Sequence, residues 1–142
     1  MSESDDGLKP WQELILTSMY LEGIVFQDYK PSQKVKKRIE FDAIREIFPR
    51  CNSFEKEMKK LTKTYGLVDD HGKGLAVLSL NKHGFGYVMS YLDDFECKDE
   101  IDRKIREFIE KKLDRISRQR FLRHPHYSKV KKIIQEINSK SN

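Results

Sequence analysis

Residues 51–80 read CNSFEKEMKKLTKTYGLVDDHGKGLAVLSL and contain the pattern that decides the fold. Apolar side chains recur in the first half at spacings of four, three and four, which places them on one face of an α-helix: Phe54, Met58, Leu61 and Tyr65. We therefore predict a helix over 53–65. Asn52 or Ser53 can cap its start, and with Asn52 as the cap, Glu55 takes the capping-box position.

A β-hairpin is predicted directly after this helix. Gly66 follows the apolar face and can adopt the left-handed conformation that ends many helices. Two short apolar runs, at 67–70 and 75–80, flank the polar turn His71-Gly72-Lys73-Gly74. Short apolar runs around a glycine-containing turn are typical of a hairpin. The stretch is thus a helix followed at once by a hairpin with a basic tip.

Two further helices are predicted before this stretch. The first covers 10–22, because Pro10 suits a first helical turn, apolar residues repeat at helical spacing, and Gly23 can end the helix. The second covers 42–48, where Asp42 can act as the cap and a proline follows the last residue. A short helix, a tight turn and a second helix with a strong apolar face form a helix-turn-helix layout.

Residues 35–41 carry a less decisive pattern. Val35, Ile39 and Phe41 share parity with Lys37, which suggests a short strand with polar residues facing outward. The alternative is a loop that leads into a helix.

The passage after the hairpin contains the most specific motif. Asn81 can cap a helix whose apolar face holds Phe85, Val88, Met89 and Leu92. The sequence Leu80-Asn81-Lys82-His83-Gly84 resembles the Leu-Thr-x-x-Gly passage that follows the wing in many winged helix-turn-helix regulators, including the MarR and PadR groups. Asn81 stands where these regulators usually have threonine.

This resemblance covers residues 10–95 and implies a fold. The expected class is α+β, mainly α: a winged helix-turn-helix with a three-helix core, a β-hairpin wing and C-terminal helices. We expect no long helix before residue 10, such as precedes the domain in MarR proteins, whereas a C-terminal helical extension fits PadR proteins better. Residues 1–9 are polar and are expected to form a disordered tail.

Residues 96–142 are expected to form that helical extension. Asp99 can cap a long helix with one apolar stripe, made by Ile101, Ile105, Phe108, Ile109, Leu113 and Ile116. The stripe must be buried, either against its own domain or against a second copy. We favour a second copy, which predicts a homodimer held together by these six residues.

Candidate nucleic-acid contacts lie on the basic segment 34–38, on the outer face of helix 53–65 and at the hairpin tip. They are Lys34, Lys36, Lys37, Arg38, Lys56, Lys59, Lys60, Lys63, Thr64, His71 and Lys73. Helix 53–65 contains no Arg, Asn or Gln, the side chains that most often read bases. Its lysines therefore predict affinity for phosphates more than choice of sequence. The alternative is a solvated surface that contacts no ligand.

Composition limits the function classes. The 142 residues carry a net charge of +5, with 37% hydrophobic and 36% charged residues, which permits an acidic partner without requiring one. The acidic N-terminus has no apolar segment, and no apolar run approaches the length of a membrane span, so we expect a soluble cytoplasmic protein. The two cysteines form no metal-ligand pattern, and no nucleotide-binding or hydrolase motif occurs. We expect neither enzyme activity, nor a metal, nor a cofactor.

The function expected from these features is binding of double-stranded DNA, as a dimeric transcriptional regulator. Two alternatives stay open. The first is a protein–protein interaction module that uses the same fold, and the second is an RNA-binding protein, which the lysine-rich surface without major-groove readers would also suit.

Overall fold

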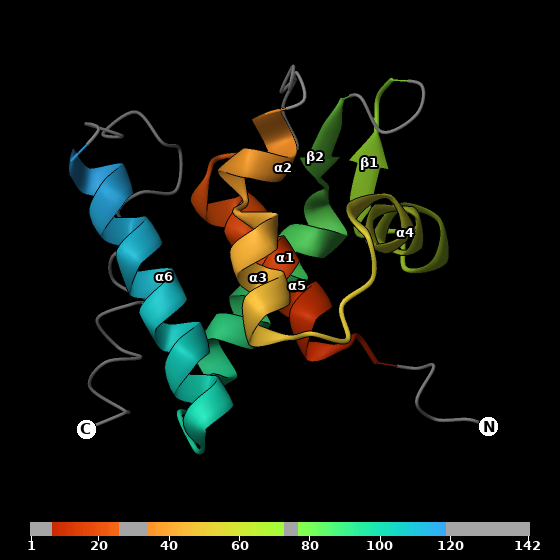
Figure 1. Cartoon of the computed structure of the whole chain (residues 1–142). Helices are drawn as coiled ribbons and strands as arrows, with labels where there is room; N and C mark the ends of the chain where they lie inside the picture. Colours follow the sequence, from red (N-terminus) through yellow and green to blue (C-terminus); the bar gives the residue numbers. More distant parts are fainter. Residues whose placement is uncertain (1–6, 26–33, 73–76, 119–142) are drawn as a thin grey trace.

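A computed structural model describes residues 7–25, 34–72 and 77–118, and it is mainly helical with one small antiparallel hairpin (Figure 1). This confirms the α+β, mainly α class. The elements, in chain order, are α1 (Pro10–Leu21), α2 (Lys34–Arg38), α3 (Phe41–Ile47), α4 (Phe54–Lys59), the π-helical segment η2 (Lys60–Thr64), β1 (Val68–Asp70), β2 (Leu78–Leu80), α5 (Lys82–Asp94) and α6 (Glu100–Arg118).

Helix α1 forms the centre of the molecule. Every residue from Leu14 to Leu21 is buried, so the helix is surrounded by its neighbours on all sides. Helices α4 and α6 lie on opposite sides of this centre in Figure 1. The predicted helix 10–22 is confirmed to within one residue, and Gly23 follows with a φ of 78°, the left-handed conformation expected at a helix end.

The predicted hairpin is also confirmed. Val68 lies opposite Leu80 and Asp70 lies opposite Leu78 in the antiparallel pair. The residues after α1 join the same sheet, because the Leu80 N–H donates to the Ile24 carbonyl at 2.9 Å. Leu80 is therefore held from both sides and is completely buried.

The short strand predicted over 35–41 is wrong. Residues 34–38 form helix α2, and Val35 and Ile39 are buried together because they lie four residues apart on one helical face. Asp42 is not a cap either. Helix α3 begins at Phe41, one residue earlier, and the residue before it is Glu40 in a left-handed conformation with a φ of 56°.

Helix α6 packs against its own chain, which overturns the expectation that its apolar stripe meets a second copy. Ile105, Phe108 and Ile109 are buried in the core that α1 and α3 also build, and Leu113 packs at its edge. Ile101 stays 37% exposed at the start of the helix, whereas the side chain of Ile116 lies outside the described residues. Asp99 caps the helix as predicted, since its carboxylate accepts the Asp102 N–H at 2.8 Å.

No helix in the described part of the chain combines the length and the apolar composition that crossing a bilayer requires.

Three tyrosines should make the fold less stable at alkaline pH. Burial raises the pKa of Tyr20, Tyr87 and Tyr91 well above the ordinary value of 10.0. The native state therefore keeps phenolic protons that the unfolded chain releases above pH 10.0, so the free energy of unfolding should be unaffected by these groups below that pH and should fall above it. Absorbance titration of the phenols should show these three ionising together with alkaline unfolding, whereas all six tyrosines should titrate near the ordinary value in denaturant. Free ionisation of all six in the folded protein would contradict the burial.

Candidate nucleic-acid interface

The helix predicted over 53–65 is formed by α4 and η2. Ser53, one of the two predicted caps, is the N-cap, and its Oγ accepts the Lys56 N–H at 3.4 Å. The last turn is wider than an α-helix, because the Tyr65 N–H donates to the Lys60 carbonyl five residues back at 2.9 Å. Gly66 then ends the helix with a φ of 65°, as expected.

The inner side of this helix is anchored by apolar packing and by one buried carboxylate. Met58 and Leu61 are completely buried, as their spacing predicts. Glu57, which the sequence places beside Glu55 at the outer start of the helix, is also completely buried. Its Oε2 accepts from Trp11 Nε1 at 2.7 Å and from the Asn52 N–H at 2.8 Å.

Glu57 is thus a residue that sequence reasoning placed on the wrong face. Its other oxygen, Oε1, accepts from Gln12 Nε2 at 3.0 Å, so two side chains of α1 hold the carboxylate. Glu57 lies three residues after Phe54, a spacing that puts both on one helical face. That spacing is the signal that could have indicated burial.

The outer side of the helix carries four exposed lysines, which we call the lysine face: Lys56, Lys59, Lys60 and Lys63. Thr64 is exposed beside them. Within residues 7–25, 34–72 and 77–118, none of these lysines forms an ion pair. Their ammonium groups are therefore available to an anionic partner, and the structure brings them together on one side of a firmly anchored helix.

The basic segment 34–38 divides into free and engaged cations. Lys36 and Lys37 are exposed, with the Lys36 ammonium 6.0 Å from the centre of the Phe41 ring. Arg38 is engaged, because its Nη2 donates to the Glu22 carbonyl at 3.2 Å and its Nε lies 3.6 Å from the Glu22 carboxylate. The side chain of Lys34 lies outside the described residues.

Of the two predicted contacts at the hairpin tip, His71 and Lys73, the structure describes only His71. His71 is exposed, but its Nε2 lies 2.6 Å from the hydroxyl of the buried Ser79, a contact that fixes the ring against the hairpin. Lys73 lies outside the described residues. The lysine face is therefore the largest group of free cations among the predicted contacts that the structure describes.

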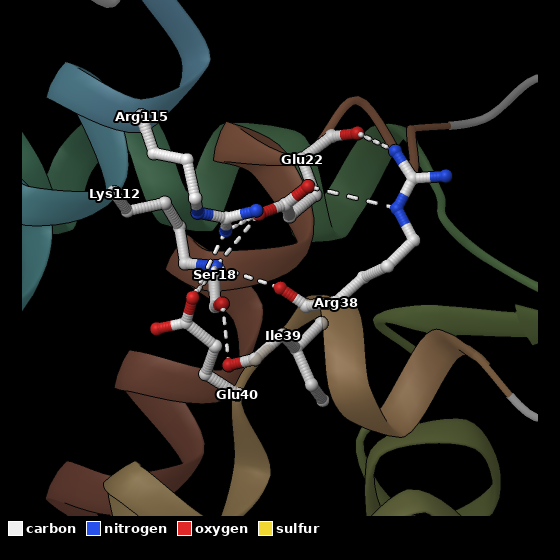
Figure 2. Close-up of polar contacts among 7 residues, drawn as sticks. All are labelled: Ser18, Glu22, Arg38, Ile39, Glu40, Lys112 and Arg115. Carbon is white, nitrogen blue, oxygen red and sulfur yellow. Dashed lines mark hydrogen bonds and ion pairs between the residues drawn. The ribbon is translucent and has the colours of Figure 1, made fainter. Parts of the chain in front are cut away.

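A second charged cluster joins α6 to the first half of the chain (Figure 2). Glu22, at the end of α1, is 3% exposed, and its Oε2 accepts from the Lys112 Nζ at 2.7 Å and from the Arg115 guanidinium. Lys112 is 1% exposed and also donates to the Arg38 carbonyl at 2.7 Å. Burial lowers the pKa of Lys112, and the Glu22 carboxylate opposes that shift.

Glu40 completes this cluster, which is structural. Its carboxylate lies 3.0 Å from Arg115 Nη2, and the left-handed turn at Glu40 is held by a hydrogen bond of 2.8 Å from Ser18 Oγ to the neighbouring Ile39 carbonyl. The two carboxylates face cations from α2 and α6 of the same chain. The opposite charges therefore neutralise one another inside the fold. Lys112 lies four residues after Phe108 of the apolar stripe, a spacing that puts both on one helical face, but the sequence gives no sign of its partner Glu22.

The candidate site is therefore the lysine face, with Lys36 and Lys37 as separate exposed cations on α2. The described residues contain no group of three or more His, Cys, Asp or Glu side chains that could hold a metal ion. Comparison of the chain with known protein families, with curated proteins and with solved structures found no match.

Proposed function

We propose that this protein is a winged helix-turn-helix protein that binds double-stranded DNA through the lysine face and acts in transcriptional regulation. The lysine face carries the proposal: four free cations lie on one side of a helix whose other side is fixed to the core. The order of elements supports the winged helix, because α3, a short turn and α4 are followed by the hairpin of β1 and β2.

The dimensions of α4 and η2 suit the major groove. The two segments together cover residues 54–64, about 16 Å of helix at about 1.5 Å per residue. A B-DNA major groove is about 12 Å wide and admits a single helix. Because Glu57 hydrogen-bonds to Trp11 and Gln12, insertion would not require the helix to move relative to α1.

The chemistry of the lysine face favours phosphate contact over base reading. Lysine ammonium groups bind phosphate as point charges, and each contact releases counterions from the duplex. No Arg, Asn or Gln lies between Phe54 and Tyr65 to pair with a base edge in two places. We therefore expect strong salt dependence and weak sequence preference from this helix.

Replacing Lys59 and Lys60 together by alanine should weaken duplex binding and reduce its salt dependence. Each lost phosphate contact removes about 0.9 from the slope of log K against log salt, so the double variant should lose about two units. Fluorescence anisotropy of a labelled random-sequence duplex, titrated at several salt concentrations, measures both quantities.

The matched control is Lys104→Ala with Lys111→Ala, two exposed lysines of α6. This variant has the same net charge but keeps the lysine face, so its slope should equal that of the wild type. Equal slopes for the two double variants would remove the lysine face from the function. Single-stranded DNA and RNA serve as competitors, and preference for either over the duplex would overturn the proposal in favour of RNA or single-strand binding.

A further inference from the structure

A groove of about 510 Å³ runs along α5 on the side where the start of α1 meets it. Its residues, apart from Glu13, all belong to α5 or follow it directly: His83, Gly86, Tyr87, Ser90, Tyr91, Asp94 and Phe95. This groove lies outside the lysine face and takes no part in the proposed DNA binding. Small residues and tyrosines alternate along it, and its two ends carry a histidine and an aspartate.

The tyrosines of the groove are held in place by the protein itself. The Tyr87 hydroxyl donates to Glu13 Oε2 at 2.9 Å, and the Tyr91 ring packs edge-on against Phe95 with ring centres 6.0 Å apart. Both rings are half-buried and present one side to the groove. Side chains fixed before association lose little conformational entropy when they bind, which makes them suitable contact residues.

The small residues leave room beside these rings. Gly86 and Ser90 are exposed on the same face of α5, and a Cβ atom added at Gly86 would meet nothing within 4 Å. An approaching partner can therefore come close to the helix backbone at Gly86, and an aromatic ring of suitable position would fill the space above it.

We propose that a second copy of this chain occupies the groove. The two α5 helices would lie antiparallel about a two-fold axis, which crosses the helix at the level midway between Val88 and Met89. Residues equidistant from that point then face one another across the axis. Gly86 receives the Tyr91 ring of the second copy, and Tyr87 lies over its Ser90. Each copy supplies both a Tyr91 ring and the space above Gly86 that receives the ring of the other copy, so both copies use the same surface.

The polar side chains at the two ends of the groove fit the same axis, because an imidazole can hydrogen-bond to a carboxylate. His83 and Asp94 lie equally far from it in opposite directions, so each histidine meets the aspartate of the other copy. Both side chains are exposed, and within the described residues neither has an ion pair in its own chain. A parallel arrangement would instead bring like residues together. The complementarity of size and of hydrogen-bonding groups about one point is the reason for choosing a second copy over an unrelated partner.

The interface would be small. Helix α5 has 13 residues, about 20 Å at about 1.5 Å per residue, and one face of it is available. Interfaces of this size belong to the weak class, so we expect a dimer that dissociates in the micromolar range. This differs from the predicted dimer of α6, because the α6 stripe is already buried in its own core.

Gly86→Leu tests the proposed interface without threatening the fold. The added Cβ atom meets nothing within 4 Å in the monomer, and leucine improves helix propensity, but the new side chain fills the space that Tyr91 of the second copy needs. Because the substitution acts twice in each dimer, the dissociation constant should rise by about 100-fold, measured by sedimentation equilibrium without nucleic acid. Lys111→Leu, which adds the same side chain to an exposed position of α6, should leave the constant unchanged.

A mixing experiment tests the two-fold pairing itself. His83→Asp places two carboxylates opposite each other, and Asp94→Lys removes the carboxylate that each histidine faces, so each variant alone should dimerise more weakly than the wild type. Mixed together, they should form a heterodimer, because the carboxylate introduced in one variant then faces the ammonium group introduced in the other. Monomeric wild type at about 1 mM, or a mixture that stays monomeric, would overturn the proposal. Neither result depends on whether the lysine face binds DNA.

Discussion

Replacing Gly84 by alanine is expected to destabilise the fold by about 3 kcal/mol or more. A Cβ atom at this position would lie 2.2 Å from the Leu67 carbonyl oxygen and 2.6 Å from Leu80 Cδ1. The carbonyl cannot move away freely, because it accepts the Asn81 N–H at 3.2 Å. Urea unfolding followed by the fluorescence of Trp11, the only tryptophan, measures the loss.

Gly86→Ala is the matched control for this prediction. It lies two residues further along α5, where an added Cβ meets nothing within 4 Å. Alanine should stabilise the helix there by about 1 kcal/mol, since it has the higher helix propensity. The two substitutions are chemically identical, so similar effects on stability would show that the close approach of α5 to the hairpin is absent in solution.

Replacing Glu22 by glutamine is expected to cost about 3–5 kcal/mol of stability. The substitution removes the charge that faces Lys112, whose side chain is 0% exposed, and it also weakens the contacts of Arg38 and Arg115. The buried ammonium group then keeps only the partly exposed Glu40 carboxylate, 3.8 Å away, as a counter-charge, so its desolvation is poorly compensated. Thermal and urea unfolding give the change in free energy.

Two further variants separate this effect from simple loss of packing. Lys112→Met should cost less than Glu22→Gln, because Arg115 and Arg38 still face the carboxylate after the lysine is gone. The double variant Glu22→Gln with Lys112→Met should be more stable than Glu22→Gln alone, since it removes the buried ammonium group that has lost its main counter-charge. A double variant less stable than both single variants would mean that the ion pair is not the source of the coupling.

The sequence predicts the local elements well where a single periodicity is present. Helix α1, the hairpin and the Asn81 cap followed from apolar spacing and turn residues, and Asn81 Oδ1 indeed accepts the Gly84 N–H at 2.9 Å. The error at 35–41 has a physical cause. Val35 and Ile39 are four residues apart, a spacing that both a strand of period two and a helix allow, and only the core decides between them.

Interactions between distant parts of the chain could not be predicted. Glu57 meets Trp11 across 46 residues, and Glu22 meets Lys112 across 90, so no local pattern relates the partners. The apolar stripe on α6 indicates that one face of the helix is buried, but it does not identify the surface against which that face packs. The lysine face was predicted because exposure of one helical face follows from burial of the other.

The long separation between Glu22 and Lys112 has a consequence for synthesis of the protein. A ribosome releases α1 roughly 90 residues before α6, so the nascent chain holds Glu22 without Lys112 or Arg115 for most of translation. The core likewise lacks Ile105, Phe108 and Ile109 until that moment. A product that terminates early, before α6, leaves the Glu22 carboxylate with Arg38 but without the two cations of α6, beside an uncovered apolar surface, which is the kind of chain that chaperones retain and proteases degrade.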